Sequence, residues 1–346
     1  MKKILVIRRD NIGDLVCTTP VFEAIKAWNP NVEIHALVNS YNADVLHGKP
    51  NISEVHIYEK LKHQRNLFGV PAAIFSRIRL LARLRRIRFD YAIVAGAGFQ
   101  PRAVGYLRWI RPMHGIGYVM ANHSASRILG QGLPTETAAG LHEVEATFHL
   151  LSTLGVQGAP GKVKIYPNKT RAENSKKNSR RQLCVGVHIS SRKPTQRWTV
   201  ENFIEFIRYL RERHNARVIL FWSPGSEQNR KHPGDDGKAT AILNQLNDAN
   251  VLPAPTSTLR DLIDQMAAPD LVVCSDGGAM HIAAGLAKPI LCFFGDSDAA
   301  HWHPWGVPYE LLQPESRRVS DISVADAIGG FEKLLVGVKH VGLGNN

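Results

Sequence analysis

Residues 271–289 read LVVCSDGGAMHIAAGLAKP. An apolar, strand-like run ends at Cys274 in a small polar turn with paired glycines, Gly277 and Gly278, and passes directly into an Ala-rich helical segment. Paired glycines let a ligand approach the backbone, and a helix start offers unpaired N–H groups suited to phosphate. This stretch therefore predicts a parallel α/β domain with an anion-binding turn at a strand's carboxyl end. The alternative is a tight turn in which Asp276 simply caps the helix.

The same alternation of short apolar runs and longer helix-periodic segments extends along the whole chain, as in parallel sheets with crossover helices. Strands are expected at residues 3–8, 33–38, 55–58, 91–95 and 115–118, and then at 183–188, 216–222, 250–252, 271–274 and 290–294. Helix starts are expected at Thr199, Thr258 and Ser323, because a hydroxyl residue precedes an apolar-periodic segment at each.

A length of 346 residues suggests two domains. A Gly- and Pro-bearing stretch followed by a basic run separates the two series of strands. We predict an N-terminal domain over residues 1–160, a linker region over 161–181 with a short strand near 163–166, a C-terminal domain over 182–336 and a loosely ordered tail over 337–346. Each domain is expected to be a doubly wound α/β sheet.

Composition and net charge restrict the cellular compartment of the protein and the classes of partner that it can bind. Apolar runs of about 18 residues are missing, and charged Arg8, Arg9 and Asp10 come too early for a signal peptide, so a cytoplasmic protein is expected. The four cysteines lack metal-ligand spacing, which predicts reduced, mostly buried thiols and no structural zinc site. A net charge of +13 attracts anionic partners.

The densest basic cluster, residues 74–88, carries apolar residues at 74, 78, 81 and 84, which predicts an amphipathic helix with a basic outer face. The helix is interpreted either as an ordinary docked helix or as a contact for an anionic membrane surface or acidic acceptor. Nucleic acid is not expected as a partner, because no recognised nucleic-acid motif accompanies the basic run.

Two carboxylates follow the first expected strand, in residues 4–20, ILVIRRDNIGDLVCTTP. The segment lacks both G-x-G-x-x-G and the P-loop pattern, which disfavours a dinucleotide or Walker-type site. Asp10 and Asp14 can accept a proton from a hydroxyl at the carboxyl end of that strand. Either can instead cap the helix that follows.

Three histidine-bearing segments have two interpretations each. His281 is either an interior histidine or a phosphate contact. Residues 142–145, HEVE, are a helix start in preference to a catalytic pair. Residues 301–305, HWHPW, supply too few ligands for a metal and are interpreted as an aromatic loop lining a cleft.

Taken together, several segments resemble glycosyltransferase family 9, the lipopolysaccharide heptosyltransferases. They are RRDNIGD at 8–14, HISS at 188–191, RW at 197–198, SDGGAMHIAA at 275–284 and FGDSD at 294–298. The resemblance implies a GT-B architecture, with two Rossmann-like domains facing a central cleft, the acceptor on the N-terminal domain and the nucleotide sugar on the C-terminal domain. It also implies inverting, metal-independent transfer of a heptose from an ADP-sugar to an anionic lipopolysaccharide-core acceptor, without a cofactor, at the inner face of the inner membrane.

The resemblance also assigns roles to residues. Asp14 matches the proposed general base, with Asp10, Asn11 and Gly13 on the acceptor side. Ser190 and Ser191 match hydroxyls that contact the donor phosphates, and Arg197, or else Lys193, is the cation that stabilises the leaving diphosphate. Glu227 matches a ribose contact. The remaining donor-binding residues are Ser275, Asp276, Gly277, Gly278 and His281, although relatives often carry threonine where Gly277 stands.

Two alternatives stay open from the sequence. The same phosphate-binding turn would serve another GT-B nucleotide-sugar enzyme, with a different donor or an epimerase activity. A non-catalytic protein that binds anionic glycolipid would use the basic helix alone.

Overall fold

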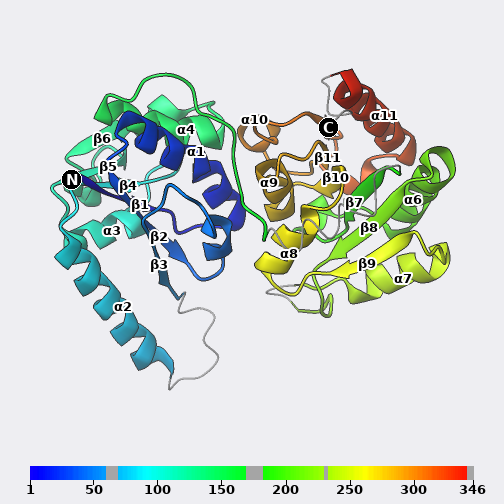
Figure 1. Cartoon of the computed structure of the whole chain (residues 1–346), viewed down its shortest axis with the longest axis horizontal. Coiled ribbons are helices and arrows are strands. Elements are labelled where there is room, and N and C mark those ends of the chain that lie inside the picture. Colours follow the sequence, from blue (N-terminus) through cyan, green and yellow to red (C-terminus); the bar gives the residue numbers. More distant parts are fainter. Residues whose placement is uncertain (60–68, 169–181, 230–232, 341–346) are drawn as a thin grey trace. The chain divides into compact units, whose positions relative to one another are not determined.

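Each half of the chain builds its own six-stranded parallel sheet. The computed structural model describes residues 1–59, 69–168, 182–229 and 233–340. The chain divides into two units, residues 1–163 and 164–346, which Figure 1 shows in the blue-to-green and green-to-red parts of the ribbon. The expected roles of the two domains stay a prediction.

In the first unit the strand order is β3-β2-β1-β4-β5-β6. The strands are β1 (Lys3–Ile7), β2 (Glu33–Asn39), β3 (Glu54–Tyr58), β4 (Tyr91–Val94), β5 (His114–Val119) and β6 (Gln131–Pro134). The helices are α1 (Ile12–Trp28), α2 (Gly69–Ile87), α3 (Pro101–Ile110) and α4 (Glu143–His149). Helix α1 packs on α4 and α2 on α3, and Figure 1 shows the two pairs on opposite faces of the sheet. The chain order reverses between β1 and β4, which is where open α/β sheets bind ligands.

In the second unit the order is β12-β11-β10-β7-β8-β9. The strands are β7 (Cys184–His188), β8 (Arg217–Trp222), β9 (Val251–Pro255), β10 (Leu271–Ser275), β11 (Ile290–Phe293) and β12 (Tyr309–Leu312). The helices are α6 (Val200–His214), α7 (Asp236–Leu246), α8 (Leu259–Met266), α9 (Gly278–Gly285), α10 (Ala299–Trp302) and α11 (Val324–His340). Here the order reverses between β7 and β10.

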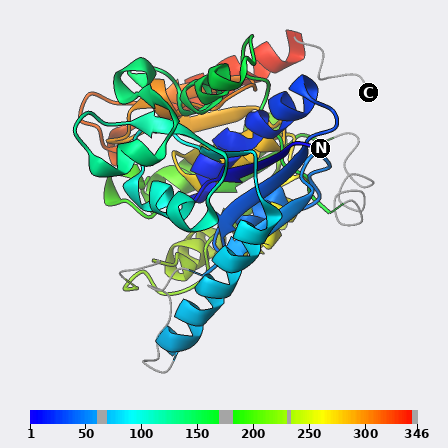
Figure 2. The ribbon, with the colours of Figure 1, turned by 90° about the vertical axis from the view of Figure 1, so that its left-hand side faces the viewer.

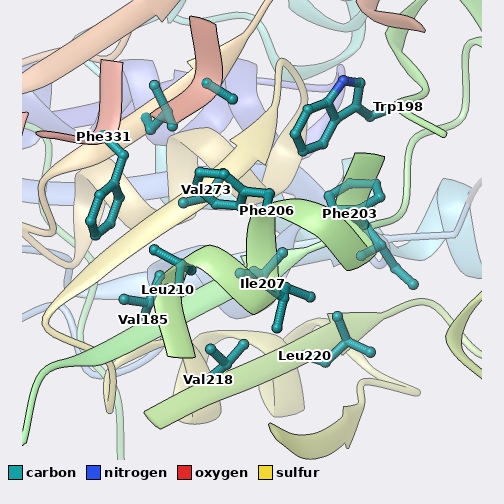
Figure 3. Close-up of a cluster of buried hydrophobic side chains, with 14 of the residues drawn as sticks. Val185, Trp198, Phe203, Phe206, Ile207, Leu210, Val218, Leu220, Val273 and Phe331 are labelled. Atoms are coloured by element: carbon teal, nitrogen blue, oxygen red, sulfur yellow. The ribbon is translucent and has the colours of Figure 1, made fainter. Parts of the chain in front are cut away.

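A hydrophobic cluster that includes Trp198, Phe203 and Phe206 forms the core of the second unit (Figure 3). The Trp198 ring lies edge-on to Phe203 and Phe206, with ring centroids 5.0 and 5.9 Å apart. Its indole Nε1–H donates to the Ile322 carbonyl at 2.8 Å, so the buried polar atom is satisfied. Because Trp198 ends the loop after β7, the core fixes one end of that loop.

The expected strands are present within one or two residues at most ends, and the three predicted caps are confirmed. The hydroxyls of Thr199, Thr258 and Ser323 each accept the N–H of the residue three positions on, at 3.0–3.1 Å. All four cysteines are buried, as predicted. In the described part of the chain, every helix is too short or too polar to cross a bilayer.

Three expectations about strands and segments need correction. The predicted strand at 163–166 is wrong, because Ile165 instead packs on the end of α9, where its N–H donates to the Gly285 carbonyl at 2.8 Å. The edge strands β6 and β12 were not predicted, since glycine and proline interrupt β6 and a charged residue interrupts β12. Of the predicted tail, residues 337–340 continue α11. Positions 341–346 and linker residues 169–181 lie outside the described residues.

Helix α2 docks by only part of its apolar stripe. Leu81 and Leu84 are buried, whereas Phe75 and Ile78 are 63% and 56% exposed. The side chain at position 74 lies outside the described residues. Figure 2 shows the first turns of α2 extending beyond the sheet of their own unit. The helix therefore presents apolar side chains among its arginines, which a simple docked helix does not require.

Candidate active site

A buried arginine organises the loop that follows β1. Arg8 is 2% exposed, and its Nη2 lies 2.8 Å from Asp14 Oδ1 and 2.7 Å from Glu143 Oε1. Its Nε lies 3.5 Å from Asp10 Oδ2. The carboxylates come from the loop, from α1 and from α4. Three carboxylates are thus gathered around one guanidinium, whose pKa they raise against the opposing effect of burial.

Asp14 also caps α1. Its Oδ2 accepts the Asn11 N–H at 2.8 Å, so the capping interpretation and the ion pair with Arg8 both hold. Burial raises the pKa of the Asp14 carboxyl, but the charge of Arg8 and the two hydrogen bonds outweigh it and lower the pKa below its ordinary value. Asp14 is therefore an ionised carboxylate at neutral pH.

Asp10 lies in a different environment in the same loop. Its side chain is 41% exposed, and burial of the remainder raises the pKa of its carboxyl, an effect that attraction to Arg8 opposes without cancelling. The two aspartates thus have pKa values shifted in opposite directions. Such a separation is typical of carboxylates with different roles.

Residues from neighbouring strands and from α3 hold the loop in place. Asn39 at the end of β2 donates through Nδ2 to the carbonyls of Arg9 and Asp10, at 2.8 and 3.0 Å. The Arg9 guanidinium lies over the rings of Tyr58 and Tyr106, 5.3 and 4.7 Å from their centroids. These residues were not predicted from the sequence, since they are distant in the chain from residues 8–14.

The turn after β10 has the expected geometry. Ser275 ends the strand and is buried, and α9 begins at Gly278. Gly277 has φ +149°, which disfavours a side chain there even though a Cβ would meet no atom within 4 Å. The alternative of Asp276 as a simple cap is wrong, because the N-cap residue of α9 is Gly277. Asp276 is available for another contact.

Asp276 contacts Gln196, a residue that was not predicted from the sequence. Gln196 is buried in the short 3₁₀ helix Pro194–Gln196, and its Nε2 donates to Asp276 Oδ2 at 3.1 Å and to Ser297 Oγ at 2.8 Å. Its Oε1 accepts the Gly295 N–H at 3.0 Å. One amide therefore ties together the loops that follow β7, β10 and β11.

The two candidate cations on the loop after β7 have different partners. Arg197 is half-buried, and its Nε donates to the Ser191 carbonyl at 2.9 Å. Lys193 Nζ lies 3.2 Å from Asp296 Oδ1, and both side chains are 48% exposed. Arg197 is thus anchored on the predicted phosphate-binding loop, whereas Lys193 pairs with an exposed carboxylate.

A buried lysine braces both ends of the same loop. Lys238 Nζ, from α7, donates to the carbonyls of Ile189 and Trp198, at 3.3 and 2.7 Å. Burial lowers the pKa of Lys238 to about 8. The Ser190 hydroxyl, between these ends, accepts the Ser223 N–H at 2.9 Å. Lys238 was not predicted as a site residue, because a lysine in the first turn of a helix usually faces solvent.

Four further predictions concern single residues or short segments. Glu227 is exposed on the loop after β8. His281 is buried in the first turn of α9, edge-on to Trp302 with ring centroids 5.9 Å apart. His142 caps α4 by accepting the Val144 N–H at 3.1 Å, which confirms the helix start. Among the described residues, neither histidine of segment 301–305 belongs to a group with metal-ligand spacing.

The predicted residues therefore gather at two places, each where the strand order of a sheet reverses. Asn11 and Gly13 accompany the two aspartates beside β1, at the point where β4 is its neighbour. Ser190, Ser191, Arg197 and the turn 275–278 follow β7 and β10, which pair with each other. Each place combines fixed backbone with charged side chains, as a ligand site at the carboxyl ends of strands requires.

The chain is similar to a set of known proteins. Residues 77–322 match the sequence model of glycosyltransferase family 9 (heptosyltransferase). Lipopolysaccharide heptosyltransferase 3 of Escherichia coli is 24% identical over 350 residues, which cover 93% of this chain and 95% of that protein.

Two solved structures have the same fold. A family 9 glycosyltransferase from Veillonella parvula has a TM-score of 0.81 at 18% identity, covering 97% of this chain and 98% of its own. An E. coli heptosyltransferase solved with ADP-2-deoxy-2-fluoro heptose has a TM-score of 0.76 at 18% identity, covering 96% and 99%. The predicted pair of α/β units is confirmed by these likenesses.

The Arg8 cluster yields a stability prediction. Glu143→Gln keeps the shape of the side chain but removes one of the charges around a buried guanidinium. We expect the free energy of unfolding to fall by about 2–3 kcal/mol, measured by urea denaturation. Glu310→Gln is the matched control, because its partner Lys333 is 73% exposed and an exposed pair contributes less than about 1 kcal/mol. Equal losses in the two variants would contradict the central role of Arg8.

Proposed function

The chain belongs to glycosyltransferase family 9 and is a glycosyltransferase, and on that premise we propose that it transfers a heptose from ADP-heptose to an anionic lipopolysaccharide-core acceptor. The names of its relatives support this substrate pair: one is a lipopolysaccharide heptosyltransferase, and another was solved with an ADP-heptose analogue. The observation that carries the proposal is the pair of built sites, an ionised Asp14 after β1 and a glycine turn at the start of α9.

The second unit holds the donor in this proposal. Backbone N–H groups of the turn 276–278 and the positive end of α9 suit a diphosphate. The hydroxyls of Ser190 and Ser191 and the side chain of Glu227 are the further donor contacts, with His281 in the adjoining turn. Gln196 and Lys238 act as positioning residues, since they fix the loops that carry these groups.

The first unit supplies the base. The Asp14 carboxylate takes the proton of an acceptor hydroxyl, the oxygen attacks the anomeric carbon of the heptose, and the bond from that carbon to the diphosphate oxygen breaks to release ADP. One displacement inverts the anomeric configuration. The pairing with Arg8 supports this role, because it keeps Asp14 ionised and in one orientation. Asp10, Asn11 and Gly13 line the acceptor side.

We propose that the leaving diphosphate is stabilised by protein groups without a metal ion. The Arg197 guanidinium, held through the Ser191 carbonyl, supplies a positive charge on the loop after β7, the strand that pairs with β10. A fixed cation stabilises charge that grows on a departing oxygen, and it needs no reorganisation during the reaction. Lys193 is the alternative cation, although Asp296 competes for it.

Helix α2 is proposed to contact the anionic surface in which the acceptor lies, at the inner face of the inner membrane. Phe75 and Ile78 are exposed on a helix whose neighbouring positions are arginines, including Arg77 and Arg79. Apolar side chains that enter the headgroup region, flanked by cations, are the pattern of helices that lie on anionic membranes.

The base is tested with two matched variants. Asp14→Asn is expected to lower kcat for heptose transfer by about 10²–10⁴-fold, because the amide cannot take the proton, while ADP binding stays within about twofold. Asp10→Asn should change kcat by less than about tenfold. Transfer is followed by ADP release and acceptor mass. Loss of activity in Asp10→Asn alone would move the base to Asp10, and full activity of Asp14→Asn would contradict its assignment.

The donor is tested by thermal shift with ADP-heptose, other ADP-sugars, UDP-sugars, GDP-sugars and dTDP-sugars. We expect ADP-heptose to raise Tm the most, because ligand binding to the folded state stabilises it in proportion to the logarithm of ligand concentration over Kd. A larger shift with a non-adenine donor would overturn the heptose proposal and leave membership of the family intact.

The membrane contact is tested by vesicle sedimentation. We expect binding to vesicles rich in phosphatidylglycerol, weaker binding to pure phosphatidylcholine, and a loss of roughly tenfold or more in the double variant Phe75→Ser, Ile78→Ser, since each buried CH₂ contributes about 0.8 kcal/mol. Met113→Ser is the control, an exposed apolar side chain off this helix. Unchanged binding of the double variant, or equal binding to both vesicles, would contradict the role of α2.

A further inference from the structure

Two histidines and a glutamate lie together on neighbouring strands of the first unit. His35 of β2 is paired in register with Glu54 of β3, and His56 is two residues further along β3. Side chains two residues apart on a strand share one face of the sheet, so the three side chains meet. Among the described residues, this is the one group of three or more His, Cys, Asp or Glu side chains whose ligand atoms all lie within 4.8 Å of one another.

The separations suit a tetrahedral ion. His35 Nδ1 lies 2.9 Å from His56 Nε2, and Glu54 Oε2 lies 3.7 Å from the first nitrogen and 3.5 Å from the second. Ligand atoms about 2.0–2.2 Å from a zinc ion at tetrahedral angles are about 3.3–3.6 Å apart. To hold an ion, the two nitrogens would move apart by a few tenths of an ångström and the two rings would turn so that their lone pairs converge on it.

The outer contacts of the cluster are those of a metal site. His35 Nε2 lies 2.7 Å from Glu33 Oε1, so its proton is on Nε2 and the Nδ1 lone pair faces the cluster. Arg83 of α2 holds the other oxygen of Glu54. Ligating histidines commonly donate their second N–H to a carboxylate, and ligating carboxylates are themselves hydrogen-bonded. Both partners are already in place.

We propose that His35, His56 and Glu54 bind a divalent transition-metal ion, Zn²⁺ foremost, with water as the fourth ligand. In the ion's absence the His56 Nε2–H donates to His35 Nδ1. When Zn²⁺ binds, the His56 proton moves to Nδ1 of the same ring, leaving two nitrogen lone pairs and one carboxylate for the metal. Because the Glu54 side chain is 34% exposed, an ion can reach the cluster from solvent at this carboxylate.

This site is separate from the transfer chemistry. His35 and Glu54 lie in the amino-terminal halves of their strands and His56 lies at the middle of β3, whereas the loop with Asp14 follows the carboxyl end of β1. A bound ion would cross-link β2 to β3 and, through Arg83, to α2. The inference therefore does not depend on the proposed function. It also revises the expectation of no zinc site, which rested on cysteine spacing and took no account of a Glu-x-His pair on a strand.

The test uses the full chain, stripped of metal with a chelator and titrated with zinc sulfate by calorimetry. We expect one Zn²⁺ per chain and a rise in Tm. His56→Asn should weaken binding by more than about 100-fold, and Glu33→Gln by about 10–100-fold, because it removes the outer partner of His35. His47→Asn, at an exposed histidine of the same unit, should bind as the unchanged protein does.

Co²⁺ provides a second readout that does not depend on stability. Visible bands of a tetrahedral Co²⁺ complex should appear in the unchanged protein and in His47→Asn, and should disappear in His56→Asn and in the milder variant Glu54→Gln. Circular dichroism checks that the variants are folded. Less than one ion bound per chain, or equal Zn²⁺ affinity and an equal Co²⁺ spectrum in both ligand variants, would overturn the proposal.

Discussion

The ion pairs of Arg8 are the interaction on which the first unit depends. A guanidinium cannot lose its proton, so once burial removes it from water its charge must be met by carboxylates. Asp14 and Glu143 meet it from two helices, α1 and α4, which therefore have to pack against each other beside β1. The same pairing leaves Asp14 ionised and oriented. Stability and the proposed proton transfer thus use one set of charges.

In the second unit an amide and a lysine hold the loops in place. In the proposed function its loops present backbone N–H groups and a cation to a diphosphate. Gln196 joins three loops through its amide, and Lys238 fixes both ends of the loop after β7 through carbonyl oxygens. Lys238 also lies near the buried carboxylate of Asp235, whose charge opposes the effect of burial on the pKa of the lysine.

The fold class was predictable because its signals are local. Residues 271–289 alone carry the pattern of a strand, a turn and a helix. Together with residues 8–14 they resemble a GT-B glycosyltransferase of family 9, and this prediction is confirmed. Partners across long sequence separations were not predictable. Nothing near Glu143 indicates Arg8, and a buried Gln196 looks like any loop glutamine. The edge strands β6 and β12 were not predicted because half-exposed strands lack a continuous apolar run. The roles assigned to individual site residues stay predictions.

A parallel sheet has two chemically different ends, and this chain uses both. At the carboxyl ends the strands deliver loops and helix starts with free N–H groups, which suit anions and changing substrates. At the amino ends, side chains on adjacent strands are held in register by the backbone ladder, so His35 and Glu54 are fixed relative to each other whatever the loops do. Such fixed spacing is what a small cation needs, since its ligands must converge within tenths of an ångström. A metal site at that end can therefore stabilise the sheet and helix α2 without constraining the loops that bind substrate.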